Sequence, residues 1–235
     1  GYVINGSKIF ISNGQHCDLI VLAAKTDPAG GAKGVSLFLV DTQTPGFSRG
    51  QNLEKIGQHA GDTSELFFND LRVPADALLG GVEGQGFVQM MRELPRERLI
   101  IGVQAVYGAK GALDATVKYV QERQAFGQAI GQFQNTRFTL AQCASDIAAA
   151  EAFLNASVAA YERGELSPEA ASALKLHTTE VMGRVADACL QLFGGYGYMA
   201  EYPISRFWTD ARVMRIYGGT SEIMKEIVAR GLLKP

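Results

Sequence analysis

The spacing of apolar residues changes near residue 85. Before it, short β-branched and aromatic runs alternate with glycine, proline and asparagine, which is typical of strands joined by turns. After it, apolar residues recur every three or four positions, which predicts long helices. Thirteen of the 27 glycines precede the change, whereas 23 alanines follow it and only seven precede it. We therefore expect an α+β fold, with a β-domain at residues 1–85 and a helical domain at residues 86–235.

The first part predicts five or six antiparallel strands with no helix between them, hence a small barrel or sandwich. Asn5-Gly6 favours a two-residue hairpin turn, because a type I′ turn needs positive φ at both central positions. That turn would join residues 2–4 to residues 7–12. Further strands are expected at residues 18–25, 35–41, 46–56 and 63–73.

The second part predicts an antiparallel four-helix bundle. Three apolar stripes have helical spacing, and the only interruption of the first is Lys110. The stripes are Leu99, Val103, Val106, Leu113, Val117 and Val120; Leu140, Cys143, Ile147, Ala150, Leu154, Val158 and Tyr161; and Leu174, Val181, Val185, Ala188 and Leu192. Ser167-Pro168 predicts the start of the third helix, with serine as N-cap and proline in the first turn. A last helix is expected at residues 221–232.

Composition narrows the function classes. The formal net charge of −2 argues against a broad basic surface for nucleic acid. No apolar run approaches the ~20 residues of a membrane span. The three cysteines and three histidines show no metal-ligand spacing, and the odd cysteine count favours a reducing compartment. Because the chain starts at Gly1, inside the expected hairpin and without an initiator methionine, we expect a fragment of a longer protein.

Three glycine-containing segments each allow two interpretations. In Gln191–Tyr198, glycines that follow a helix cap it, or they let a ligand approach the backbone; a Rossmann fingerprint is excluded because no strand precedes them. In Arg123–Gly127, the arginine complements a helix end or reaches a pyrophosphate. In Ile216–Glu222, Thr220 or Ser221 caps a helix, whose N-terminus also offers N–H groups to an anion or a carbonyl oxygen.

Glu97 also has two interpretations. It lies between Arg96 and Arg98 in an otherwise apolar helical pattern. A charged run of this kind usually forms a solvated face. Alternatively, Glu97 points into a cleft and acts as a base.

Taken together, these motifs resemble those of the acyl-CoA dehydrogenases, a family of FAD-dependent flavoproteins, over essentially the whole chain. The most specific part is a C-terminal signature that runs from Gln191 through the glycines to Asp210. Arg123-x-x-Phe126-Gly127 is similar to the family's flavin diphosphate motif. The segment from Phe10 to Gly14 is similar to the one that lies against the flavin ring.

The resemblance implies an organisation larger than this chain. Members have an N-terminal helical domain, a middle β-domain and a C-terminal four-helix domain, of which the first is absent here. It also implies a homotetramer built as a dimer of dimers, with FAD shared across a subunit boundary. An electron-transferring flavoprotein would reoxidise the FAD. The location would be the cytoplasm in a bacterium and the mitochondrial matrix in a eukaryote.

The resemblance implies ten cofactor contacts: Phe10, Ser12, Arg123, Phe126, Gln134, Gln191, Gly194, Gly195, Thr220 and Glu222. The first two would contact the isoalloxazine ring. The next three would hold the diphosphate and adenosine of an FAD in a neighbouring subunit, and the following three would line that cofactor. The last two would lie near the flavin. Four implied substrate contacts are Thr26, at the CoA part, Arg98, Gly218 and Gly219.

The catalytic base is the one departure from the commonest family pattern. Many members carry it as the glutamate of Ile-Tyr-Glu-Gly-Thr, where this chain has Gly218. The long-chain and isovaleryl branches carry it instead on the first long helix, at the position of Glu97. The long-chain branch also has Ile-Tyr-Gly-Gly-Thr, as here. Burial beneath the flavin would favour protonated Glu97, whereas nearby Arg98 would favour the carboxylate.

The implied reaction is oxidation of an acyl-CoA to trans-2-enoyl-CoA. Glu97 would remove the α-proton, and the β-hydride would pass to the flavin. Similarity to the long-chain branch favours a long or branched acyl chain. Two alternatives remain: a non-catalytic assembly or binding protein on the same fold, and an acyl-CoA oxidase that passes electrons to oxygen.

Overall fold

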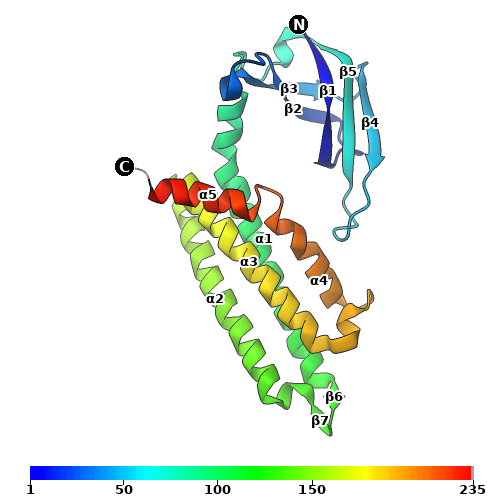
Figure 1. The fold of residues 1–235 in the computed structure, drawn as a ribbon, viewed down its shortest axis with the longest axis vertical. Coiled ribbons are helices and arrows are strands. Elements are labelled where there is room, and N and C mark those ends of the chain that lie inside the picture. The colour runs from blue at the N-terminus through cyan, green and yellow to red at the C-terminus, as the bar shows by residue number, and fades with distance from the viewer. Residues whose placement is uncertain (234–235) are drawn as a thin grey trace. The chain divides into compact units, whose positions relative to one another are not determined.

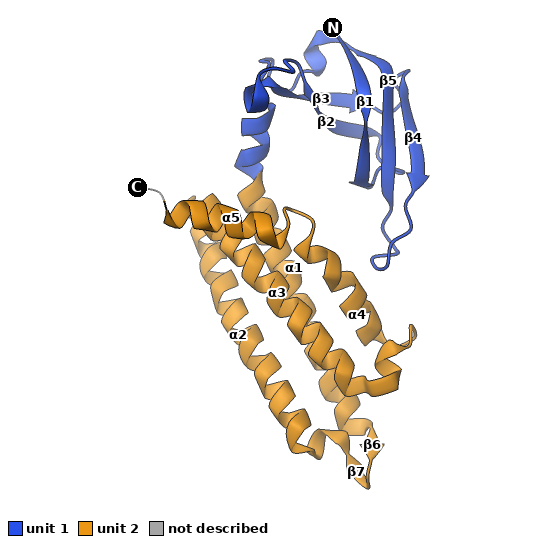
Figure 2. Cartoon of the chain, viewed as in Figure 1, with its two compact units in different colours: residues 1–93 blue, residues 94–235 orange. Residues whose placement is uncertain are grey.

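The computed structural model describes residues 1–233, and the chain forms two compact units. The first unit is Gly1–Glu93 and the second begins at Leu94 (Figure 2). The first contains an antiparallel β-domain and the second contains most of the helical residues, so the α+β fold class is confirmed.

The first unit contains two antiparallel sheets (Figure 1). Its strands are β1 (Tyr2–Ser12), β2 (Leu19–Lys25), β3 (Val35–Asp41), β4 (Phe47–Asn52) and β5 (Thr63–Val73). One sheet has the order β1-β5-β4 and the other pairs β2 with β3. The expected bounds of β3 and β5 are confirmed, whereas the fourth strand is shorter than predicted. Buried residues such as Phe38, Val40 and Phe68 form the core of the first unit.

The predicted Asn5-Gly6 hairpin is wrong. β1 is one continuous strand paired with β5, and a register shift lies between Ile4 and Gly6. Asn5 Nδ2 donates to Asp70 Oδ1 at 3.0 Å, and the Asp70 N–H donates to Asn5 Oδ1 at 2.7 Å. These bonds hold Asn5 against β5, and Gly6 supplies the φ of +149° in an irregularity rather than in a turn.

The second unit is built around long helices. They are α1 (Gly86–Glu122), which begins in the first unit, α2 (Gln134–Glu162), α3 (Pro168–Phe193), α4 (Pro203–Arg212) and α5 (Ser221–Leu232). Two paired strands of two residues each, β6 (Gln124–Ala125) and β7 (Gln128–Ala129), lie in the connection between α1 and α2. Short 3-10 turns lie at Gly31–Gly34, Ala75–Ala77, Ile130–Gln132, Gly194–Tyr198 and Val213–Arg215.

The expected start of α3 and the expected range of α5 are confirmed. The Ser167 hydroxyl accepts from the Ala170 N–H at 3.1 Å, which is the predicted N-cap. Helix α4 and the β6–β7 pair were not predicted. In the first stripe Val103 is exposed, because the buried face of α1 is formed largely by small residues such as Ala105 and Ala109.

Glycines on α1 allow close packing against α3. A Cβ atom at Gly102 would lie 3.1 Å from the Leu174 side chain, and one at Gly108 would lie 3.3 Å from that of Met182. The central position of α3 matters for the site, because this helix contributes the groups that hold the segment before α5. Within residues 1–233, none of the helices combines the length and apolarity of a membrane span.

Candidate functional site

The segment between α4 and α5 is bonded to α1 through Arg98. The Arg98 side chain is 5% exposed. Its Nε lies 3.5 Å from the Gly218 carbonyl oxygen, and its Nη1 donates to Ser172 Oγ on α3 at 3.1 Å. Burial lowers the pKa of Arg98, and the charge of neighbouring Glu97 opposes that shift. Arg98 therefore joins the turn of α1 that carries Glu97 to both α3 and the Gly218 segment.

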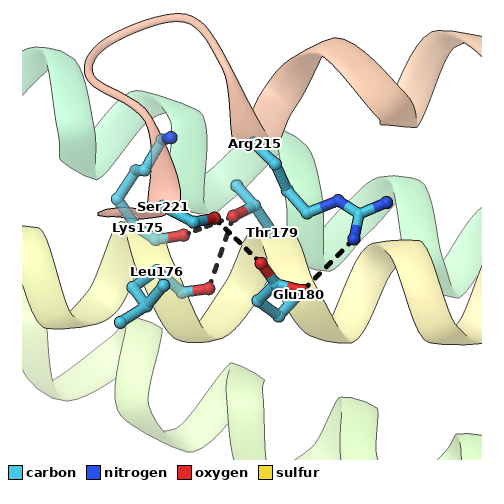
Figure 3. A network of polar contacts seen from close by, with 6 residues as sticks. All are labelled: Lys175, Leu176, Thr179, Glu180, Arg215 and Ser221. Atoms are coloured by element: carbon cyan, nitrogen blue, oxygen red, sulfur yellow. Dashed lines mark hydrogen bonds and ion pairs between the residues drawn. The ribbon is translucent and has the colours of Figure 1, made fainter. Parts of the chain in front are cut away.

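α3 holds the same segment through two further side chains. Lys175 is fully buried, and its Nζ donates to the Gly219 carbonyl oxygen at 2.7 Å. Glu180 accepts from Ser221 Oγ at 2.8 Å and pairs with Arg215 at 3.3 Å, so it bridges both ends of the segment (Figure 3). Thr179 bonds back to the carbonyls of α3. Lys175 and Glu180 thus hold the segment against α3.

Gly218 and Gly219 adopt conformations that other residues rarely take. Their φ angles are +66° and +98°. A Cβ atom at Gly218 would lie 2.5 Å from Ile101 Cδ1, and one at Gly219 would lie 2.6 Å from Met224 Cε. The glutamate that the resemblance gives as the commoner residue at position 218 would therefore meet both backbone strain and a neighbouring side chain.

Glu97 is exposed within the part of the chain that the structure describes. The burial expected of this carboxylate is thus not provided by its own unit. Its place is nevertheless defined, since the next residue of the helix is anchored to the Gly218 segment. The direct substrate contact expected of Arg98 stays a prediction, because its guanidinium is bonded to Gly218 and Ser172 inside the unit.

Thr220 and Glu222 form the start of α5. The Thr220 hydroxyl accepts from the Ile223 N–H at 3.3 Å, which is an N-cap bond. The pKa of Glu222 is lowered, first by its own backbone N–H and then by the Thr220 hydroxyl. Both are hydrogen bonds to the charged form. The helix start thus has polar groups and a carboxylate beside the two glycines.

A second cluster lies where α1 and α3 end. A cavity of about 490 Å³ is lined by four of the predicted cofactor residues, Arg123, Gln191, Gly194 and Gly195. The Arg123 guanidinium lies 5.2 Å from the centre of the Tyr196 ring. Phe126 and Gln134 are exposed outside that lining. Gly194 also caps α3, with φ at +58°, so both interpretations of this glycine are compatible with the structure.

The lining of this cavity suits an anionic group that approaches the backbone. A Cβ atom on Gly194 or Gly195 would meet nothing within 4 Å, so the backbone there is open to a ligand. Arg123 offers a planar cation at this lining, and the Tyr196 ring lies beneath it. A dinucleotide diphosphate such as that of FAD has matching chemistry. No group of three or more potential metal-binding side chains occurs among residues 1–233.

The three predicted site residues of the first unit occur at strand ends. Phe10 has a positive φ of 61° in an irregular part of β1, and its side chain is 72% exposed. Ser12 ends β1 and is exposed. Thr26 follows β2, bonds Ser36 Oγ at 2.8 Å and lines a cavity of about 790 Å³ together with Lys8 and Lys25.

Sequence reasoning missed Lys175, Ser172 and Glu180. The available signal was a lysine on α3 between Ala171 and Thr178, on the face that the apolar stripe assigns to the core. A lysine there must be paired with an acceptor.

Comparison with known proteins identifies the family. The model of the acyl-CoA dehydrogenase middle domain matches residues 1–71, and that of the C-terminal domain matches residues 84–233. The chain belongs to the acyl-CoA dehydrogenase family. Among members of this family, the mitochondrial long-chain specific acyl-CoA dehydrogenase of Sus scrofa is 44% identical over 234 residues, 99% of this chain and 54% of that protein.

Two other relatives show the breadth of the family. The acryloyl-CoA reductase (NADH) of Anaerotignum propionicum is 42% identical, over 99% of this chain and 59% of its own length. The crystal structure of an acyl-CoA dehydrogenase from Geobacillus kaustophilus matches with a TM-score of 0.97 and 46% identity, over 99% of this chain and 62% of that one. This chain thus spans little more than half the length of the curated relatives.

Proposed function

We propose that the chain acts in FAD-dependent α,β-dehydrogenation of an acyl-CoA thioester, with Glu97 as the base that removes the α-proton. One observation supports this most directly. Arg98, the residue after Glu97, is bonded to Gly218, the position where many members carry their base. A carboxylate on α1 and the backbone donors of the Gly218 segment therefore belong to one connected structure.

Removal of the α-proton requires both the carboxylate and the backbone donor. The α-proton of a thioester is weakly acidic, so its removal needs a positioned carboxylate and a donor for the charge that develops on the carbonyl oxygen. Glu97 supplies the carboxylate in this proposal, and the N–H of Gly218 supplies the donor. A glycine keeps that N–H although it lacks a side chain.

FAD, when bound, supplies the acceptor for the hydride from the β-carbon. In this proposal Arg123, with Phe126 and Gln134, holds its diphosphate and adenosine part, while Gln191, Gly194 and Gly195 line the same group. The remaining proposed flavin contacts are Phe10, Ser12, Thr220 and Glu222. Thr26 and Gly219 are proposed to contact the substrate. A homotetramer and an electron-transferring flavoprotein as acceptor are part of the same proposal.

Anaerobic titration of the FAD-loaded protein with acyl-CoAs of graded length tests the function. Bleaching of the flavin absorbance with formation of trans-2-enoyl-CoA supports it, and the most effective chain length defines the substrate. Bound flavin that no acyl-CoA bleaches indicates a non-catalytic protein. Peroxide release on admission of oxygen indicates an acyl-CoA oxidase. Because one relative is named for reduction of acryloyl-CoA, enoyl-CoA with NADH is included as a further substrate pair.

A further inference from the structure

Two buried cations bond consecutive glycine carbonyls. Arg98 reaches the Gly218 oxygen from α1, and Lys175 reaches the Gly219 oxygen from α3. These side chains are 5% and 0% exposed. Figure 3 shows the Lys175 side chain leaving α3 on the side of the segment that leads to Ser221. One short stretch of backbone is thus held by two helices that are separate in the sequence.

The planarity of the peptide bond also fixes the direction of the neighbouring N–H groups. The C=O and N–H of one trans peptide point in opposite directions. Since the carbonyls of Gly218 and Gly219 point at the two cations, the N–H groups of Gly219 and Thr220 point away from them. The two cations therefore fix the two peptides that directly follow the Gly218 N–H proposed as the donor.

This arrangement is electrostatically costly for Lys175. Burial and then the nearby charge of Arg98 lower its pKa to about 8, while Glu180 on α3 and Glu222 on α5 oppose that shift. A buried cation beside another cation does not by itself stabilise the fold, because both charges lose their hydration. An apolar side chain of similar length would fill the same space without the desolvation cost.

We propose that Lys175 is a positioning residue, which holds the Gly218–Thr220 backbone in the orientation that the proposed dehydrogenation requires. This inference rests on the proposed function for its kinetic part only. Lys175 acts through the Gly219 carbonyl and touches no reacting atom. Its loss should loosen the segment and slow the chemical step without a matching loss of global stability.

The test compares Lys175→Met with Lys110→Met in the FAD-loaded protein. Lys110 lies on α1, where it pairs with Glu151 at the surface of the bundle, so it serves as the matched control. Hydrogen exchange of the peptide that spans residues 214–224, kcat and KM, and the thermal unfolding midpoint are measured for both variants and the parent.

For Lys175→Met we expect exchange in that peptide to accelerate about tenfold and kcat to fall about tenfold, with KM changed less than about threefold. The unfolding midpoint should be kept or raised. Lys110→Met should leave exchange and kcat unchanged. Unchanged exchange in Lys175→Met overturns the proposal, as does a lowered midpoint with unchanged kcat.

Two further outcomes also decide the role of Lys175. If Lys175→Met does not fold, Lys175→Gln is measured in the same way, and failure of both variants to fold overturns the proposal in favour of a structural role. If the parent protein oxidises no acyl-CoA, the proposed function fails, while the exchange measurement still decides whether Lys175 orders the segment.

Discussion

Arg98 and Gly218 lie 120 positions apart in the sequence, and the guanidinium Nε of the first lies 3.5 Å from the carbonyl oxygen of the second. The same guanidinium donates to Ser172, so one side chain joins α1, α3 and the segment before α5. This contact gives the glutamate at position 97 a fixed relation to the two glycines, although Glu97 itself is exposed.

Arg98→Lys should destabilise the protein by about 1–3 kcal/mol, because a lysine cannot reach Gly218 and Ser172 with two separate nitrogen atoms. Urea unfolding followed by circular dichroism measures the loss. Arg92→Lys, an exposed position on the same helix, is the control and should stay within about 0.5 kcal/mol of the parent. Equal stability of Arg98→Lys and the parent would show that the two bonds contribute nothing.

The titration of Lys175 should make stability rise with pH above about 8. Burial and the charge of Arg98 lower its pKa to about 8 in the folded chain, whereas an unfolded lysine titrates near 10.4. Between these values the unfolded chain holds a proton that the folded chain has released. This group therefore raises the free energy of unfolding with pH by at most about 1.4 kcal/mol per unit.

Urea unfolding at about pH 7.5 and about pH 9.5 checks this, since the two conditions lie on either side of the folded pKa. The rise due to Lys175 should vanish in Lys175→Met and persist in Lys110→Met. If the parent and Lys175→Met show the same pH dependence, the lysine is not buried as described.

Arg123→Met should weaken binding of FAD about 10- to 100-fold, because a charge-assisted bond to the diphosphate is removed. Quenching of flavin fluorescence on titration with the apoprotein gives the dissociation constant. Arg163→Met removes an exposed arginine just after α2 and should leave affinity unchanged. Equal affinity of both variants would place the diphosphate elsewhere.

Moving the carboxylate to position 218 should need a second change. Gly218→Glu puts a side chain at a φ of +66° and a Cβ 2.5 Å from Ile101 Cδ1. We expect the double variant Glu97→Gln/Gly218→Glu to recover little turnover, and addition of Ile101→Ala to recover about tenfold more, because the added side chain then has room. Steady-state turnover of the two variants is the comparison. Equal rates would show that Ile101 is not the obstacle.

The local sequence pattern predicted an element correctly where local propensity and tertiary packing favour the same structure. The alternation in residues 63–73 and the Ser167-Pro168 start predicted β5 and α3 because burial and capping favour the same elements there. Asn5-Gly6 has the propensity for a turn, but pairing of β1 with β5 and the two Asn5–Asp70 bonds favour a continuous strand. α4 is only ten residues long, and none of the three predicted apolar stripes includes its residues.

The candidate site was predictable as a set of motifs but not as a set of contacts. The glycines, Arg123 and Glu97 belong to recognisable segments, so the sequence proposes them as site residues. Lys175 escaped notice because lysines are usually exposed, and only the three-dimensional structure brings its Nζ to the Gly219 carbonyl. The exposure of Glu97 agrees with a solvated face, one of the two interpretations that the sequence left open.

The role of Glu97 is the central claim, and the most direct test is an anaerobic titration of FAD-loaded Glu97→Gln with the acyl-CoA that the parent oxidises. Glutamine keeps the size of the side chain but cannot accept the α-proton. We predict normal flavin content and no bleaching, while Glu93→Gln, one turn earlier on α1, bleaches as the parent does. Bleaching of Glu97→Gln at the parental rate would contradict the account.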